Sequence, residues 1–385
     1  MDDAYQGREQ TKAKHFILRT YLQALAFKVL NGPRGWSALT YIDGFSGPWE
    51  TRAADHTDSS FMIAINVLKD AQDRIFNQTG VRKPIHCFFS ENIRKNFSEL
   101  EATVRLHHDP SGQFFIDTYY GNFEDALPRI ETLIGNSFAL FFIDPTGWTG
   151  YSLKVLAPYI KGRSREVLIN FMYDHINRFK DSPDPKTIES LNPILGGEGW
   201  QDKLSLGLPR GLAVEKLFRD ELKQAGEFSH VLSTCIDKAT VNRPHFFLTY
   251  GTKNLKGVET FRDVEANALK AYDRDRISAK LRKRSERTNM DDLFADDDTD
   301  PITYDEVVAR EKKSAEEASC ALLEARASIP FDELCATLLE AFMIRVTHVK
   351  DICVSLYKAG LINKNWEKQK PKSGDIIIRK PEQFH

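Results

Sequence analysis

The chain has 385 residues, of which 41% are hydrophobic and 28% are charged, and its formal net charge is -2. This composition is that of a water-soluble globular protein with more than one domain. A net charge near zero gives no overall attraction to nucleic acids or membranes, so any basic surface has to be local. No stretch approaches the roughly 18 apolar residues that a membrane span needs, and residues 1–10 contain no apolar signal region. We therefore expect a cytoplasmic protein without a membrane segment.

The cysteines are dispersed and form no C-x-x-C pair. This spacing argues against a zinc knuckle or an iron–sulfur site within the chain, so we predict no metal site. An odd, scattered set also fits reduced thiols better than a disulfide framework. The five cysteines are Cys87, Cys235, Cys320, Cys335 and Cys353.

The first two thirds of the chain alternate between apolar runs and helical patterns. A helix is predicted over residues 11–30, with Thr11 as its N-cap. Strands are predicted at 38–43, 85–91, 114–120, 138–144, 165–171 and 245–250, with helices between them at 61–76, 92–104, 123–133 and 151–160. Ser59 or Ser60 is expected to cap the second helix. This alternation predicts an α/β fold with a doubly wound, mainly parallel sheet, interrupted by a helical insertion at about 175–240.

The last third predicts a basic helix, a linker and a small second domain. Residues 270–288 contain eight Lys or Arg against three acids. An acidic linker with a connecting helix is expected at 289–329. Helices at 330–342 and 346–359, the second capped near Thr347, then precede a hairpin with strands at 361–362 and 376–378. We expect three parts: a domain over 1–288, the linker, and a winged-helix-like α+β domain over 330–385.

Acids or amides stand at four successive strand ends. Because parallel strands end at one edge of a sheet, these side chains are expected to line one cleft there. The four residues are Asp43, Glu91, Asn122 and Asp144.

Such a cleft would suit a nucleoside cofactor. Asp43 with the following glycines could hold an amino-acid end, Glu91 could accept hydrogen bonds from ribose hydroxyls, and Asn122 could flank an adenine. There is no G-x-G-x-x-G fingerprint and no P-loop, which favours S-adenosylmethionine over a dinucleotide or a nucleoside triphosphate. The predicted cofactor-binding residues are Asp43, Gly44, Phe45, Gly47, Glu91, Asn122 and Phe123.

These residues also have purely structural interpretations. Asp43 before a glycine is common turn chemistry. Glu91 and Asn122 can each cap the helix that follows, and Asp144 followed by proline can simply open a turn.

Asp144, Pro145 and Trp148 are the candidates for the reacting end. An Asp-Pro turn can surround an exocyclic amino group with a carboxylate and main-chain carbonyls while an aromatic ring stacks on the base. Amino methyltransferases of adenine or cytosine use an Asp-Pro-Pro-aromatic turn, and here the aromatic falls one place late. His175, after the fifth strand, is a candidate base, whereas Lys14 and His15 are interpreted as a solvated helix face.

A basic loop in the C-terminal unit is a candidate nucleic-acid contact. Residues 345–380 contain nine Lys or Arg against three acids, which would favour phosphate contact. A dimerisation surface or a solvated face remains an alternative. The proposed contact residues are Lys364, Trp366, Lys368, Lys370 and Lys372.

The sequence resembles the three-Cys-motif partner protein family. The resembling stretches are Thr11-Lys-Ala-Lys-His, Tyr41-Ile-Asp-Gly-Phe-Ser-Gly-Pro, Phe142-Ile-Asp-Pro-Thr-Gly-Trp, Glu166-Val-Leu-Ile-Asn-Phe-Met and His245-Phe-Phe-Leu-Thr-Tyr-Gly-Thr. The resemblance spans about residues 10–265 and implies a class I methyltransferase-like Rossmann domain in a bacterial or phage context. It also implies a separate partner protein with three cysteines, in a pattern suggestive of iron–sulfur or radical chemistry. Many members have Gly where this chain has Trp49.

Three functions stay open from the sequence. The first is an S-adenosylmethionine-dependent methyltransferase acting on a base amine of DNA or RNA. The second is a non-catalytic Rossmann-fold partner, its cleft filled by Trp49, that holds the three-cysteine protein or nucleic acid. The third is a metal-dependent nuclease using Asp43, Glu91 and Asp144, although carboxylates spread along a sheet edge are usually too far apart for one ion.

Overall fold

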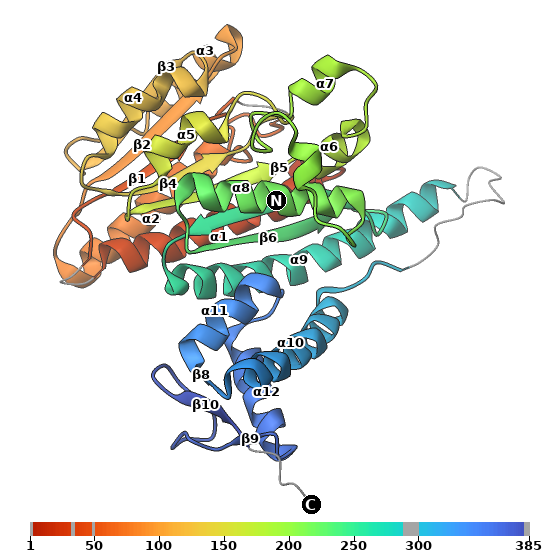
Figure 1. The fold of residues 1–385 in the computed structure, drawn as a ribbon. Helices are drawn as coiled ribbons and strands as arrows, with labels where there is room; N and C mark the ends of the chain where they lie inside the picture. Colours follow the sequence, from red (N-terminus) through yellow and green to blue (C-terminus); the bar gives the residue numbers. More distant parts are fainter. Residues whose placement is uncertain (1–2, 32–34, 48–50, 288–299, 381–385) are drawn as a thin grey trace, which may run out of the picture.

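A seven-stranded sheet forms the centre of the larger domain (Figure 1). The computed structural model describes residues 3–31, 35–47, 51–287 and 300–380. The strand order is β3-β2-β1-β4-β5-β7-β6; β1 to β5 pair in parallel and β7 is antiparallel to both of its neighbours. The predicted doubly wound, methyltransferase-like Rossmann sheet is confirmed. The strands are β1 (Leu39–Asp43), β2 (Ile85–Glu91), β3 (Phe114–Tyr120), β4 (Phe138–Ile143), β5 (Arg165–Phe171), β6 (His230–Asp237) and β7 (Pro244–Thr252).

Helices cover both faces of this sheet because its central strands are apolar on both sides. Along β5, Leu168 packs into the core on one face while Val167 and Ile169 pack into the core on the other. The first face is covered by α1 (Glu9–Leu30), α2 (Ser60–Thr79), α3 (Arg94–Arg105) and α9 (Leu255–Arg287). The second is covered by α4 (Phe123–Ile134), α5 (Leu153–Ile160) and α8 (Arg210–Gly226). None of the described helices is long and apolar enough to cross a membrane.

The cap predictions had mixed outcomes. Ser59 caps α2 as expected, its Oγ accepting the Met62 N–H at 3.3 Å. The Thr11 cap was wrong: α1 starts at Glu9, after a short 3-10 helix at Asp3–Tyr5, and the Glu9 carboxylate accepts the Gly7 N–H instead. The cap near Thr347 was also wrong, because α12 begins at Val346 with Arg345 in the N-cap position.

The insertion expected at 175–240 is narrower in the structure. Residues 210–237 form α8 and the edge strand β6, which belong to the sheet and its covering layer. The irregular part between β5 and α8 contains α6 (Tyr173–Phe179), α7 (Pro185–Glu189) and a 3-10 helix at Trp200–Lys203. The fully buried Trp200 anchors it in the core of the second face.

The smaller unit packs beneath α9 (Figure 1). It contains α10 (Tyr304–Arg326), β8 (Ser328–Pro330), α11 (Phe331–Ala341), α12 (Val346–Lys358), β9 (Ile362–Asn363) and β10 (Ile376–Arg379). The expected helices and hairpin strands are present, and β8 adds an unpredicted third strand that pairs with β10. A winged-helix domain remains the prediction for this unit. Of the predicted linker, only residues 300–329 lie in the described part of the chain.

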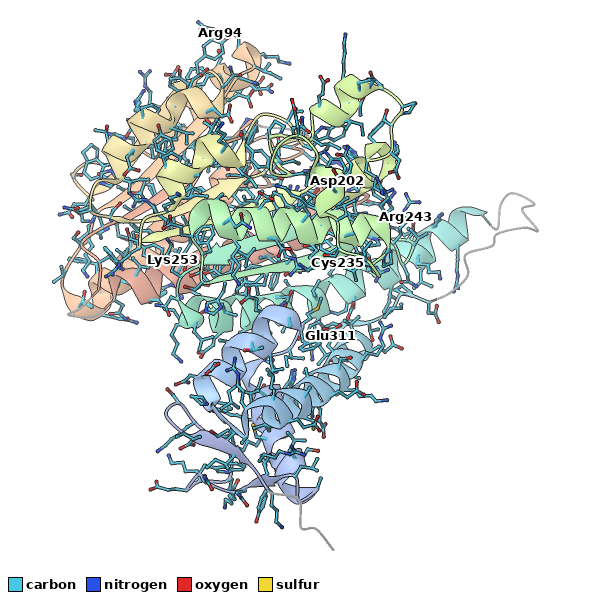
Figure 2. The ribbon with its side chains drawn as sticks, in the orientation of Figure 1. Arg94, Asp202, Cys235, Arg243, Lys253 and Glu311 are labelled. Atoms are coloured by element: carbon cyan, nitrogen blue, oxygen red, sulfur yellow. The ribbon has the colours of Figure 1, made fainter. Side chains whose placement is uncertain are left out.

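Polar contacts fix the smaller unit to the larger domain. Arg262 of α9, only 3% exposed, donates from Nε to the Leu339 main-chain oxygen at 2.8 Å and pairs with Glu265. Glu340 at the end of α11 accepts hydrogen bonds from Lys223 and from the Val231 N–H. Within the smaller unit, Glu311 of α10 (labelled in Figure 2) accepts the Met343 N–H at 3.2 Å.

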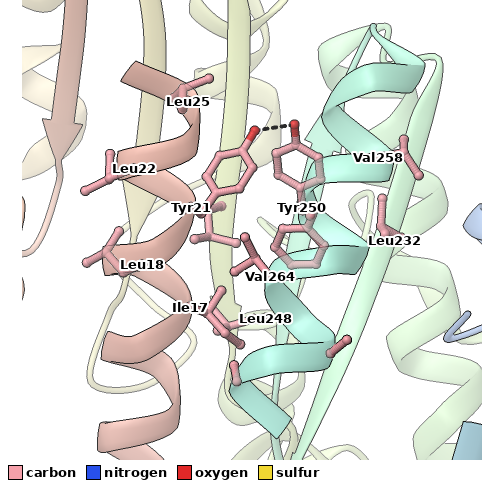
Figure 3. Close-up of a cluster of buried hydrophobic side chains, with 14 of the residues drawn as sticks. Ile17, Leu18, Tyr21, Leu22, Leu25, Leu232, Leu248, Tyr250, Val258 and Val264 are labelled. Carbon is pink, nitrogen blue, oxygen red and sulfur yellow. Dashed lines mark hydrogen bonds between the residues drawn. The ribbon is translucent and has the colours of Figure 1, made fainter. Parts of the chain in front are cut away.

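A buried polar cluster joins α1 to the sheet. The hydroxyls of Tyr21 and Tyr250 lie 2.5 Å apart (Figure 3), and the Glu166 carboxylate accepts hydrogen bonds from Tyr21 and from Thr252. Burial raises the pKa of Glu166. The cluster sets the position of α1 against β5 and β7.

Candidate active site

The central strands β1 and β4 end where the sheet order reverses. In open α/β sheets, ligands bind at this place, outside the carboxyl ends of the strands. Two adjoining hollows lie there, and they share the residues Phe45, Pro145 and Thr146.

The first hollow, of about 190 Å³, brings together most of the predicted cofactor residues. Its wall is formed by the loops after β1, β2, β3 and β4. The lining residues are Gly44, Phe45, Ser90, Glu91, Asn92, Ile93, Gly121, Asn122, Phe123, Pro145, Thr146, Gly147, Thr149 and Gly150.

Gly44 is needed where the loop after β1 meets α4. A Cβ on Gly44 would lie 2.9 Å from the ring of Phe123, closer than side chains tolerate. The Ser90 hydroxyl donates to the Gly44 main-chain oxygen at 2.9 Å and joins this loop to β2. A side chain at position 44 would therefore collide with α4 at the edge of the first hollow.

Glu91 is the last residue of β2, and Asn122 follows the end of β3. Glu91 is 4% exposed, lines the hollow, and accepts the Ile93 N–H at 2.6 Å through Oε1. Asn122 occupies the N-cap position of α4 without a side-chain cap hydrogen bond, and its Nδ2 donates to Asp125 at 3.2 Å. The cap interpretation thus fails for the side chain of Asn122.

Asp43 does not line either hollow. It is fully buried, and its carboxylate accepts the Phe45 N–H at 3.1 Å and the Ser60 hydroxyl at 2.9 Å. Burial raises the pKa of Asp43 to about 6, against the opposing effect of these hydrogen bonds. In the structure Asp43 fixes the loop that carries Gly44 and Phe45, and its contact with a cofactor stays a prediction.

Phe45 separates the two hollows. Its ring centroid lies 5.8 Å from that of Phe123, and a Cβ on Gly150 would come within 2.9 Å of it. An elongated ligand that occupies both hollows would therefore pass along the ring of Phe45.

The second hollow, of about 370 Å³, receives residues from α1, the β1 loop, β4, β5 and β7. Gly47 and Asp144, both predicted, and His175, the candidate base, line it. The lining residues are Arg8, Thr11, Lys14, His15, Phe45, Gly47, Asp58, Ser59, Ser60, Asp144, Pro145, Thr146, Asn170, Met172, His175 and His245.

Both oxygens of Asp144 are engaged. Lys14 Nζ lies 2.5 Å from Oδ2, and Asn170 Nδ2 donates to Oδ1 at 2.7 Å. The side chains of Lys14 and Asp144 are 13% and 14% exposed. The interpretation of Lys14 as part of a solvated face was wrong, because α1 lies over the sheet edge and points this residue inward.

His15 and His245 contribute imidazole rings to the second hollow. His15, also expected on a solvated face, is buried and lies 3.0 Å from the Tyr5 hydroxyl through Nδ1. Burial lowers the pKa of His15 well below its usual value and lowers that of His245 as well. Sequence reasoning assigned no role to Asn170 or His245, although both lie in the stretches that carry the family resemblance.

Trp148 lies outside both hollows. Its Nε1 donates to the Ser190 hydroxyl at 2.9 Å, and its ring centroid is 5.6 Å from that of Phe179. In the structure the ring anchors the segment around α6 and α7, and its stacking on a substrate stays a prediction. Trp49 lies outside the described residues.

The side chains of the basic loop in the smaller unit differ in their burial. Trp366 is 4% exposed and packs near Tyr357, at a centroid distance of 6.1 Å, so its ring lies in the core of the smaller unit and not on the surface of the loop. Lys370 pairs with Asp351. All four lysines are exposed, and Lys364, Lys368 and Lys372 are those for which no ion pair is described.

The carboxylates at the strand ends do not form a metal site. Among the residues that the structure describes, no group of three or more His, Cys, Asp or Glu side chains could hold a metal ion. Asp43, Glu91 and Asp144 therefore do not gather as the nuclease hypothesis requires.

Comparisons with known proteins return only distant structural neighbours. No protein-family model matches the sequence, and no curated protein sequence does. The O-methyltransferase TomG from Streptomyces achromogenes, solved with SAM, has a TM-score of 0.32 at 10% identity, over 64% of this chain and 90% of its own. A loganic acid methyltransferase with SAH has a TM-score of 0.29 at 8% identity, over 76% of this chain and 93% of its own. The fold assignment accordingly rests on the strand order and register.

Proposed function

We propose that this protein is methyltransferase-like and binds S-adenosylmethionine at the carboxyl edge of its sheet. The observation that carries the proposal is the pair of adjoining hollows at the point where the strand order reverses. One hollow would hold the nucleoside and the other the acceptor, with Phe45 and Pro145 at their junction.

The residues of the first hollow fit a nucleoside. Glu91 presents a carboxylate, which only accepts hydrogen bonds and so suits ribose hydroxyls. The backbone at Gly44 can be approached closely, and Phe123 supplies an apolar surface beside it. When bound, S-adenosylmethionine would supply an electrophilic methyl group at the junction with the second hollow.

The acceptor that we propose is an amine of a nucleic-acid base. The Asp144–Pro145 turn lies in the second hollow, where Lys14 and Asn170 hold the carboxylate in place. The exposed lysines of the smaller unit would bind phosphates of the same substrate. A separate three-cysteine protein is proposed as partner on the sequence resemblance alone.

A second candidate function is a non-catalytic Rossmann-fold partner. Two observations favour it: both oxygens of Asp144 already have partners, and the first hollow of about 190 Å³ is smaller than the roughly 300–1,000 Å³ of common ligand pockets.

Calorimetric titration of the full chain with S-adenosylmethionine distinguishes the two candidates. The methyltransferase proposal expects micromolar binding that Glu91→Gln weakens by about tenfold or more, because a charge-assisted hydrogen bond contributes about 1.5–3 kcal/mol. Gln keeps an oxygen for the Ile93 N–H, and Glu99→Gln, on the exposed face of α3, is the matched control. No heat at millimolar ligand would favour the non-catalytic candidate.

A further inference from the structure

Two residues that line the second hollow, Asn170 and His245, each contain a buried polar atom with no hydrogen-bond partner within the described part of the chain. These atoms are Oδ1 of Asn170 and Nδ1 of His245. Asn170 as a residue is 3% exposed. Buried polar atoms in folded proteins are almost always hydrogen-bonded, so an unpartnered pair in one hollow points to a ligand that completes them.

The orientation of Asn170 follows from its neighbour. A carboxylate can only accept hydrogen bonds, so the atom facing Asp144 Oδ1 at 2.7 Å has to be the amide nitrogen. The carbonyl oxygen of Asn170 is then the atom left without a partner. Since it can only accept, the missing ligand atom is a donor, an N–H or an O–H.

Nδ1 of His245 requires a second polar atom of the ligand as its hydrogen-bond partner. Its imidazole is neutral at neutral pH because burial lowers its pKa. A neutral imidazole carries one N–H, so Nδ1 either donates or accepts according to its tautomer. In the tautomer with the proton on Nδ1, the ligand atom beside it is an acceptor nitrogen or oxygen.

We propose that Asn170 and His245 recognise the amidine edge of the acceptor, an amino group bonded to the same carbon as a ring nitrogen. The amino group would donate to Asn170 Oδ1, and the ring nitrogen would accept from His245 Nδ1. Adenine and cytosine carry this edge, and guanine carries it through its 2-amino group and N3. The inference rests on the proposed function and assigns the residues that recognise its acceptor.

The charges in the second hollow disfavour a carboxylate acceptor. The ammonium group of Lys14 is already paired with Asp144, and Arg8 is paired with Asp58. An incoming carboxylate would face the Asn170 oxygen, another acceptor, without a hydrogen between them.

Ligand-observed NMR on the full chain tests the recognition, with S-adenosylhomocysteine present. The probes are 9-methyladenine, its N6,N6-dimethyl derivative, which has no N–H to donate, and benzoate. We expect 9-methyladenine to bind at least tenfold more tightly than either of the others. Asn170→Leu and His245→Phe should each weaken 9-methyladenine binding at least fivefold, whereas Asn77→Leu, on the exposed face of α2 and outside both hollows, should leave it unchanged.

Equal binding of 9-methyladenine and its dimethyl derivative, or tighter binding of benzoate, would overturn the inference. The comparison of the three probes on the wild-type protein tests the inference even if the Asn170→Leu variant does not fold. Calorimetry with S-adenosylhomocysteine separates the two proposals. If the protein binds the cofactor but does not distinguish the probes, this inference alone is refuted. If the protein does not bind the cofactor, the proposed function is refuted. The probe series measured without cofactor then still tests recognition of the amidine edge.

Discussion

Lys14 and Asp144 form an ion pair between the first helix and the end of β4, although they stand 130 positions apart in the chain. The pair is mostly buried and lies in the wall of the second hollow. It places a neutralised carboxylate where an amino group is proposed to bind, and it makes α1 part of the candidate site.

Replacing Lys14 by Met should destabilise the fold by about 3 kcal/mol, because it leaves the Asp144 carboxylate buried without its cation. Urea unfolding at neutral pH measures this. The double variant Lys14→Met with Asp144→Asn should recover most of the loss, since both charges are then absent. Lys12→Met, at the more exposed pair with Asp275, is the control and should cost less than about 1 kcal/mol. An equal loss of unfolding free energy in Lys14→Met and Lys12→Met would contradict the burial of the pair between Lys14 and Asp144.

Asp43 should make the fold less stable as the pH rises from about 4 to 6. Burial raises its pKa to about 6 in the folded state, whereas the unfolded chain releases the proton near pH 4. The folded state binds more protons in this window, so the contribution is present below pH 4 and is lost as the pH rises through 6. Between pH 4 and pH 7, the free energy of unfolding should fall by about 3 kcal/mol relative to Asp43→Asn.

Urea titrations of both proteins at four pH values give this difference. Ser60→Ala sharpens the test, because it removes a donor to the ionised carboxylate and should raise the pKa of Asp43 further. Parallel stability curves for wild type and Asp43→Asn would show that the carboxyl does not titrate in this range.

Arg262→Met should loosen the smaller unit from the larger domain. It leaves the carboxylate of Glu265, which is 1% exposed, buried without its cation and hydrogen-bonded to the Thr234 hydroxyl, and it removes the hydrogen bond to Leu339. We expect a loss of about 3–5 kcal/mol and faster proteolytic release of residues 300–380. Arg274→Met, exposed on the same helix, should stay within about 0.5 kcal/mol of wild type.

Trp366→Ala should act on stability and not on ligand contact. The ring is buried beside Tyr357, and truncating a buried Trp costs about 3–5 kcal/mol. Circular dichroism melting of the full chain should show an earlier transition for the smaller unit. A variant that melts like wild type would mean that the ring is exposed in solution.

We predict that the exposed lysines of the basic loop bind the phosphate groups of a nucleic acid. Changing Lys364, Lys368 and Lys372 together to Ala should weaken binding of a fluorescent single-stranded oligonucleotide. It should also flatten the dependence of log affinity on log salt by about 2, since each phosphate contact on a single strand contributes about 0.7. Ala substitution of Lys312, Lys313 and Lys358 is the matched control. An unchanged slope in the first variant would remove the basic loop from the interface.

The central strands could be predicted because they are buried on both faces. Phe138–Ile143 is a continuous apolar run that only a central strand accommodates, and its end fixes Asp144 at the sheet edge. The edge strand β6 was missed, since it pairs on one side only and its mixed sequence follows a segment broken by Pro and Gly. The position of Gly44 in the first hollow followed from the strand end in the same way.

The second hollow could not be predicted in the same detail. Lys14 looks like a solvated residue in the sequence of α1, and its inward position depends on how that helix crosses the sheet. Asn170 lies one residue before the end of β5, so a rule based on strand ends passes over it. Trp366 stands among lysines, yet the hairpin turns its ring into the core. Each outcome depends on tertiary packing, which local sequence does not encode.

The Tyr21–Tyr250 contact also sets an order of events during synthesis. The two residues are 229 positions apart, so α1 leaves the ribosome long before β7 exists. At about 5–20 residues per second, roughly 10 to 45 s pass before the partner strand is made. For that time, we expect the side of α1 that packs on β7 and α9 to stay exposed or to be bound by chaperones or transient contacts, whereas α2 can pack on α1 earlier. The part of the second hollow that contains Lys14 would therefore be among the last parts of the domain to fold.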